Sequence, residues 1–162
     1  MVEILKRIFD NMEIQEIENR INEITGKYKA DWKGKRIAIL EDDPDQQELL
    51  ELMIDTIAGK NNTTIKKYNS SPAHIDGLND GDKVFDLIIV DGDLRGHETG
   101  SQGIKRLNDR ELKIIARTGS ETELSEFKNE GVDLAIFKRV GSRDAFWDEM
   151  KQIASIFQNY KE

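Results

Sequence analysis

The sequence predicts an α/β fold, a doubly wound five-stranded parallel sheet with helices on both faces. Short continuous apolar runs alternate with longer stretches of helical periodicity, and this alternation is typical of β/α units joined by right-handed crossovers. Runs of Val, Ile and Leu without polar interruption are typical of parallel strands that are buried on both faces. Such runs predict strands at residues 37–40, 85–90, 112–117 and 134–137, and β-branched residues predict a further strand at 63–68.

Residues 1–33 are predicted to form an N-terminal helical extension. Apolar residues three and four apart predict a short helix before residue 10 and a longer one from about 11 to 25, which Gly26 ends. Asp10 and Glu13 have the spacing of a capping box, and a polar connector follows from Lys27 to Lys35. The apolar stripe either packs on the rest of the chain or forms a homodimer. We favour packing because its register changes near residue 12, whereas a coiled-coil seam needs unbroken heptads.

Residues 34–162 are predicted to form the α/β domain itself. Pro44 suits the first turn of a helix that runs to Gly59. A short helix opens at Ser71-Pro72, and another follows the Gly-rich loop 92–100. Two further helices are predicted at about 121–130 and 143–160.

Composition narrows the class of protein and its partners. The chain has 162 residues, a formal charge of −8 and no cysteine, which argues against disulfides, thiolate catalysis and the usual zinc sites. A strongly acidic protein is a poor match for nucleic acid or an anionic membrane, so we expect protein partners. No apolar stretch approaches the roughly 18 residues that span a bilayer, and the expected location is cytoplasmic.

Residues with chemical function follow the predicted strands directly. Glu41 and Asp42 follow the first strand, Asp91 the third, Thr118 the fourth and Lys138 the fifth. In open α/β sheets, ligands bind at the carboxyl ends of the strands, so these side chains should converge at one edge. Clustered carboxylates repel one another unless a cation neutralises them, and Mg²⁺ favours such oxygen ligands.

This order of residues resembles the receiver domain of two-component response regulators, over residues 34–160. The resemblance implies a flavodoxin-like strand order, 2-1-3-4-5. It implies that Asp91 accepts a phosphoryl group from a sensor histidine kinase or a histidine phosphotransfer protein, with Thr118 and Lys138 assisting transfer. It also implies that Mg²⁺ is held by Glu41, Asp42, Asp91 and the backbone carbonyl of Asp93. Such a domain is not an enzyme in its own right and signals by binding a downstream protein target.

Departures from the family pattern, at Ala135 and Arg139 among other positions, keep other functions open. Ala135 stands where an aromatic residue is common, and Arg139 follows Lys138 where proline is usual. A pseudo-receiver adaptor that works without phosphorylation is therefore an alternative. Asp91-Gly92-Asp93 together with Glu41 is also similar to Toprim domains, which are Mg²⁺-dependent nucleic-acid enzymes. The acidic charge disfavours that alternative, and it leaves Thr118 and Lys138 unexplained.

Overall fold

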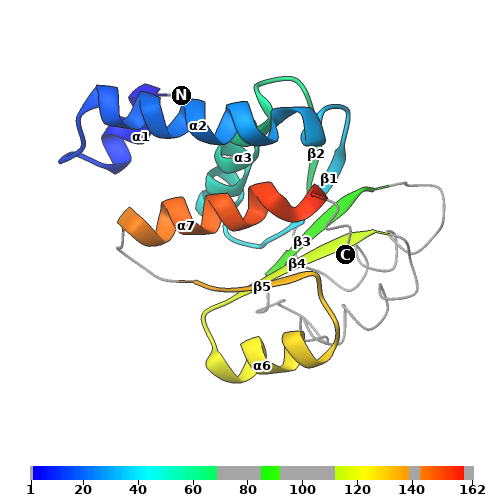
Figure 1. Cartoon of the computed structure of the whole chain (residues 1–162). Helices are drawn as coiled ribbons and strands as arrows, with labels where there is room; N and C mark the ends of the chain where they lie inside the picture. The colour runs from blue at the N-terminus through cyan, green and yellow to red at the C-terminus, as the bar shows by residue number, and fades with distance from the viewer. Residues whose placement is uncertain (1, 69–84, 92–111, 139–142, 159–162) are drawn as a thin grey trace.

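The structure, a computed structural model, describes residues 2–68, 85–91, 112–138 and 143–158 (Figure 1). The predicted helices that open at Ser71-Pro72 and follow the loop 92–100 lie outside these residues. Asp93 and Arg139 lie outside them as well. No helix in the described part of the chain is both long enough and apolar enough to cross a membrane.

The sheet confirms the predicted strands and their order. All neighbouring strands are parallel, in the order β2-β1-β3-β4-β5. The strands are β1 (Arg36–Leu40), β2 (Thr64–Tyr68), β3 (Leu87–Asp91), β4 (Lys113–Thr118) and β5 (Leu134–Phe137). The strands β1 and β3 are neighbours, and the strands that follow them in the chain, β2 and β4, lie toward opposite edges of the sheet. A crevice is therefore expected at the carboxyl ends of β1 and β3.

Helices cover the sheet on both faces, as a doubly wound fold requires. Among the described residues, α3 (Pro44–Ala58) and α7 (Arg143–Ala154) lie on one face, and α6 (Glu121–Asn129) lies on the other (Figure 1). Alternate residues of the strands enter two separate apolar cores. Ile37, Ile39 and Ile89 face α3 and α7, whereas Leu40 and Val90 share the second core with Phe127 of α6.

The N-terminal helices α1 (Val2–Ile8) and α2 (Ile14–Trp32) pack on the α3 and α7 side of the molecule (Figure 1). Their buried residues belong to the same apolar core as α3, α7 and the inner strands. Trp32 is fully buried, and its indole N–H donates to the carbonyl of Ala154 at 2.9 Å. The predicted packing of these helices on the rest of the chain is therefore confirmed, while self-association and the division of the chain at residue 34 remain predictions.

The predicted ends of α2 were wrong. The helix begins after Glu13, whose side chain makes no capping hydrogen bond, and it passes through Gly26 to Trp32. A glycine inside a helix costs about 1 kcal/mol relative to alanine. Tyr28 and Trp32 are buried beyond it, and each large apolar side chain contributes about 1.5–3 kcal/mol on burial. Burial therefore outweighs the local preference of Gly26 to end the helix.

The last predicted helix also ends earlier than expected. Helix α7 ends at Ala154, and a 3₁₀ turn over Ser155–Phe157 follows it directly. Phe157 still packs on the core, with its ring 4.8 Å from that of Trp32 in an edge-to-face arrangement. The apolar stripe that predicted a long helix is thus formed partly by a tighter turn.

Candidate functional site

Three carboxylates meet where β1 and β3 end. Glu41 and Asp42 directly follow β1, and Asp91 is the last residue of β3. One oxygen from each carboxylate can be chosen so that all three lie within 4.8 Å of one another. Glu41 and Asp91 are 2% and 5% exposed, so water does little to screen their mutual repulsion.

Burial changes the acidity of Glu41. Its pKa is raised to about 7, first by loss of solvent, then by the hydrogen bond and the charge of Asp91, against a lowering by Lys138. Glu41 Oε2 is buried and has no hydrogen-bond partner among the described residues. A buried oxygen of this kind is costly unless a proton or a cation satisfies it.

Lys138 supplies the positive charge that faces these acids. It follows β5, and its backbone N–H donates to the carbonyl of Thr118 at 2.7 Å, which extends the β4–β5 ladder by one step. Its ammonium lies 2.7 Å from Asp91 Oδ1 and 3.6 Å from Glu41 Oε2. One cation thus contacts carboxylates from two different strands.

Thr118, the last residue of β4, is 2% exposed and turns its hydroxyl toward α6. Thr118 Oγ1 donates to Glu123 Oε2 at 2.7 Å and accepts from the Ser120 backbone N–H at 3.0 Å. The only proton of the hydroxyl is therefore used within the turn that joins β4 to α6.

The turn after β1 orients the acidic pair through the start of α3. Asp43 caps α3 by accepting from the Asp45 N–H at 2.9 Å, and Pro44 occupies the first turn, as predicted. The Asp43 N–H donates to Glu41 Oε1 at 3.2 Å, and the side-chain amide of Gln47 donates to the carbonyl of Glu41. These contacts fix Glu41 by both its backbone and its side chain.

A buried ion pair lies directly beside the site. Arg117, next to Thr118, is 3% exposed and donates from Nε to Glu149 Oε1 of α7 at 2.5 Å. Its other nitrogens lie 3.4 and 3.5 Å from Gln46 Oε1 on α3. The pair therefore ties the end of β4 to both helices on that face of the sheet.

The predicted residues line one hollow of about 690 Å³ at the carboxyl edge of the sheet. The structure brings together Glu41, Asp42, Asp91, Thr118 and Lys138, and Asp93 lies outside the described residues. The hollow and its three acids suit a hard divalent cation, because they offer oxygen ligands and leave room for water. Glu41 Oε2, which has no hydrogen-bond partner among the described residues and lies 3.6 Å from Lys138 Nζ, gives such a cation a further oxygen ligand.

Sequence reasoning missed two residues that line or border the site, Glu123 and Arg117. Ser120 and Glu123 have the S-x-x-E spacing of a capping box, and that spacing was a usable signal. Arg117 lies in an apolar strand run and gave no comparable signal, because its partner Glu149 is 32 residues away.

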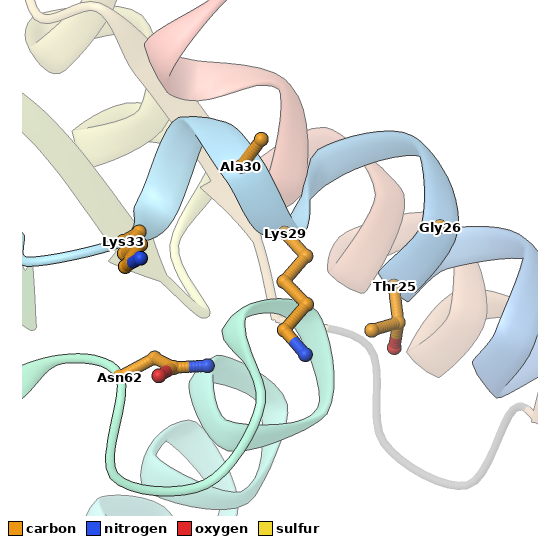
Figure 2. Close-up of a pocket in the computed structure, with 6 residues that line it drawn as sticks. All are labelled: Thr25, Gly26, Lys29, Ala30, Lys33 and Asn62. Carbon is orange, nitrogen blue, oxygen red and sulfur yellow. The ribbon is translucent and has the colours of Figure 1, made fainter.

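A second hollow, of about 370 Å³, lies between α2 and the turn that follows α3 (Figure 2). Figure 2 shows Lys29 extending from α2 toward this turn. The turn requires glycine at position 59, where φ is +83° and a Cβ would come within 2.9 Å of Asn62 Nδ2. Lys29 Nζ would lie 3.6 Å from a Cβ at this position, so its positive charge is close to the carboxyl end of α3, where a cation is favourable. The hydroxyl of Thr25 and the side-chain amide of Asn62 are already bonded to backbone carbonyls.

Several solved structures that resemble this chain are response regulators or receiver domains. The Mn²⁺-bound form of response regulator Rcp1 has a TM-score of 0.64 and 16% identity, covering 79% of this chain and 97% of that chain. The phosphorylated cyanobacterial phytochrome response regulator RcpA has a TM-score of 0.64 and 13% identity, over 80% and 97%. A receiver domain from Rhodospirillum rubrum has a TM-score of 0.60 and 23% identity, over 75% and 92%. The similarity to these structures shows that the chain has the receiver fold. The sequence matches no family model and no curated protein.

Proposed function

We propose that the chain is a response regulator receiver that accepts a phosphoryl group on Asp91 from a phosphohistidine of a sensor histidine kinase or a phosphotransfer protein. The observation that carries this proposal is the contact of Asp91 with Lys138, in a hollow that also holds Glu41, Asp42 and Thr118. A carboxylate nucleophile, a cation and further acids are the groups that phosphoryl transfer to an aspartate needs.

In the proposed transfer, one oxygen of Asp91 forms a bond to phosphorus while the bond from phosphorus to the histidine nitrogen breaks. The electron pair of that bond stays on the histidine nitrogen. If the other ring nitrogen carries a proton, the released imidazole is neutral; if it does not, the released nitrogen takes a proton from water. Lys138 offsets the negative charge on the transferring oxygens. Glu41, Asp42 and Asp91 would hold Mg²⁺, with the backbone carbonyl of Asp93 as the family resemblance implies, and the ion would supply further positive charge at the same oxygens.

The location and the partners follow from this role. A cytoplasmic signalling protein that acts by binding a downstream target needs no catalytic activity of its own.

The contact between Lys138 and Asp91 supports a receiver over a Toprim-like nucleic-acid enzyme, since a Toprim site leaves that lysine without a role. Self-association through residues 1–33 would use the exposed Ile4, Ile8 and Ile14, which the described part of the chain leaves uncovered.

Intact mass spectrometry after incubation with acetyl phosphate and Mg²⁺ tests the proposal. The wild type should gain one phosphoryl group, and Asp91→Asn should gain none. Asp148→Asn, which changes an exposed aspartate on α7, serves as the matched control and should label like the wild type. Labelling that persists in Asp91→Asn would refute the assignment. A complete lack of labelling in the wild type would favour the adaptor that works without phosphorylation.

A further inference from the structure

The hydroxyl of Thr118 bridges two groups at the N-terminus of α6. The Ser120 N–H donates to Thr118 Oγ1, and Thr118 Oγ1 donates to Glu123 Oε2. The Glu123 N–H in turn donates to Ser120 Oγ at 3.3 Å, which makes Ser120 the N-cap of the helix. The three residues thus form a closed ring of hydrogen bonds, in which two of the three donors are backbone N–H groups.

This ring is a capping box with one extra member. In a capping box, the glutamate at the third helical position accepts directly from the backbone N–H of the N-cap residue. Here that N–H donates to Thr118 instead, and Glu123 accepts from Thr118. If the Thr118 hydroxyl were withdrawn, Glu123 and the Ser120 N–H would be left to bond each other.

A threonine hydroxyl carries one proton and can donate one hydrogen bond. Thr118 lines the same hollow as Asp91, so an anion attached to Asp91 would present new acceptor oxygens there. Thr118 cannot donate to such an anion and to Glu123 at the same time. Since Glu123 also lines this hollow, the roughly two negative charges of a phosphoryl group would further disfavour its present position.

We propose that Glu123 is a positioning residue that competes with the phosphoryl group for the Thr118 hydroxyl, and that phosphorylation releases Glu123 to complete the capping box with Ser120. This inference rests on the proposed function of Asp91. The start of α6 then has two hydrogen-bonded arrangements, and the state of Asp91 selects between them. Without phosphate, the Thr118–Glu123 bond stabilises the unphosphorylated arrangement and weakens anion binding.

A double-mutant cycle tests the competition. Calorimetry would measure the affinity of beryllium fluoride, a tetrahedral phosphoryl analogue, in the presence of Mg²⁺. Glu123→Gln should raise this affinity about tenfold, because the Thr118 proton is no longer held by a charged acceptor. In the Thr118→Ala background, the same substitution should raise it less than about twofold, leaving only the effect of the lost charge. Glu126→Gln removes an exposed charge from the same helix and should change the affinity little in either background.

The outcomes separate this inference from the proposed function. Equal gains from Glu123→Gln in both backgrounds would overturn the inference, because Glu123 would then act by charge alone. Unchanged affinity in Glu123→Gln and in Glu123→Ala would overturn it as well. Failure of every protein to bind beryllium fluoride, together with no labelling by acetyl phosphate, would refute the proposed function and this inference with it. Melting temperatures of all variants confirm that each one is folded.

Discussion

Lys138 Nζ lies 2.7 Å from Asp91 Oδ1, although 47 residues separate the two in the chain. The contact spans two strands that are not neighbours, because β4 lies between β3 and β5. Asp91 is the last residue of β3 and Lys138 follows the last residue of β5, so both lie at the carboxyl edge of the sheet. The same ammonium lies 3.6 Å from Glu41 Oε2, so Lys138 acts on the whole acidic cluster.

Replacing Lys138 should affect metal binding and phosphoryl transfer in opposite directions. Lys138→Met removes a positive charge that repels Mg²⁺, so Mg²⁺ should bind several-fold more tightly. Labelling of Asp91 by acetyl phosphate should slow by about 100-fold, since the charge on the transferring oxygens loses one of its partners. Calorimetry and intact mass measure the two effects. Lys128→Met, an exposed change on α6, is the control, and a parallel loss of both properties would argue for a purely structural role.

Magnesium should stabilise the fold through Asp42. Ligand binding to the native state raises the free energy of unfolding by about 1.4 kcal/mol at tenfold the dissociation constant, which corresponds to a rise in melting temperature of roughly 3–6 °C for a chain of this size. Asp42→Asn should abolish this shift. Asp45→Asn, an exposed change in the first turn of α3, should retain it. A wild type whose melting temperature ignores Mg²⁺ would contradict the metal site.

The raised pKa of Glu41 predicts how stability depends on pH without metal. Its pKa is about 7 in the fold, against an ordinary value of 4.5, so the folded chain holds the proton more tightly than the unfolded chain. The contribution of Glu41 to the free energy of unfolding is therefore greatest below pH 4.5, and it is lost as the pH rises through about 7. Glu41→Gln should be more stable than the wild type at pH 8, by about 1–3 kcal/mol, and the gain should shrink toward pH 5.

Denaturant unfolding at several pH values, with the metal chelated, measures this dependence. Saturating Mg²⁺ should remove the advantage of Glu41→Gln, because the cation neutralises the ionised carboxylate in the wild type. A gain that is the same at pH 5 and pH 8 would show that the pKa of Glu41 is not raised.

Trp32 should be essential to stability, because α2 is part of the main core. Trp32→Ala removes a fully buried ring and its hydrogen bond to Ala154, and it should lower the free energy of unfolding by about 3–5 kcal/mol. Ile14→Ala, on the same helix but 53% exposed, should cost less than about 0.5 kcal/mol. Urea titrations of the full chain compare the two, and equal small losses would indicate that α2 is only loosely attached.

The buried pair of Arg117 and Glu149 should be sensitive to the loss of one partner. Among the described residues, Glu149→Ala leaves the buried guanidinium with only the side chain of Gln46 beside it, and it should cost about 3–5 kcal/mol. Adding Arg117→Met to Glu149→Ala should recover most of that loss, because no buried charge then remains unpaired. Chemical denaturation of the single and double variants checks this. A double variant less stable than Glu149→Ala would show that the guanidinium packs favourably without its partner.

Local patterns predicted much of the fold. Continuous apolar runs identified four of the five strands, because a strand buried on both faces tolerates few polar residues. The strand β2 is mostly exposed, and its β-branched residues predicted it. Pro44 marked the start of α3 because its fixed φ suits a first helical turn. Gly26 misled the prediction, because its cost to a helix is smaller than the burial of Tyr28 and Trp32 beyond it. That burial depends on α3 and α7, which a local window does not include.

The sequence by itself determined which residue types end the strands of this protein, and parallel strands in one sheet necessarily bring those ends to one edge. That reasoning was sufficient to predict Glu41, Asp42, Asp91, Thr118 and Lys138 as neighbours. Only the tertiary structure decided which atoms meet within that group, such as the Thr118 hydroxyl with Glu123 and the ammonium of Lys138 with Asp91. The strength of a hydrogen bond or ion pair changes when the distance between its atoms changes by a few tenths of an ångström. The packing of α3, α6 and α7 on the sheet sets those distances. Neither residue spacing nor composition encodes that packing directly.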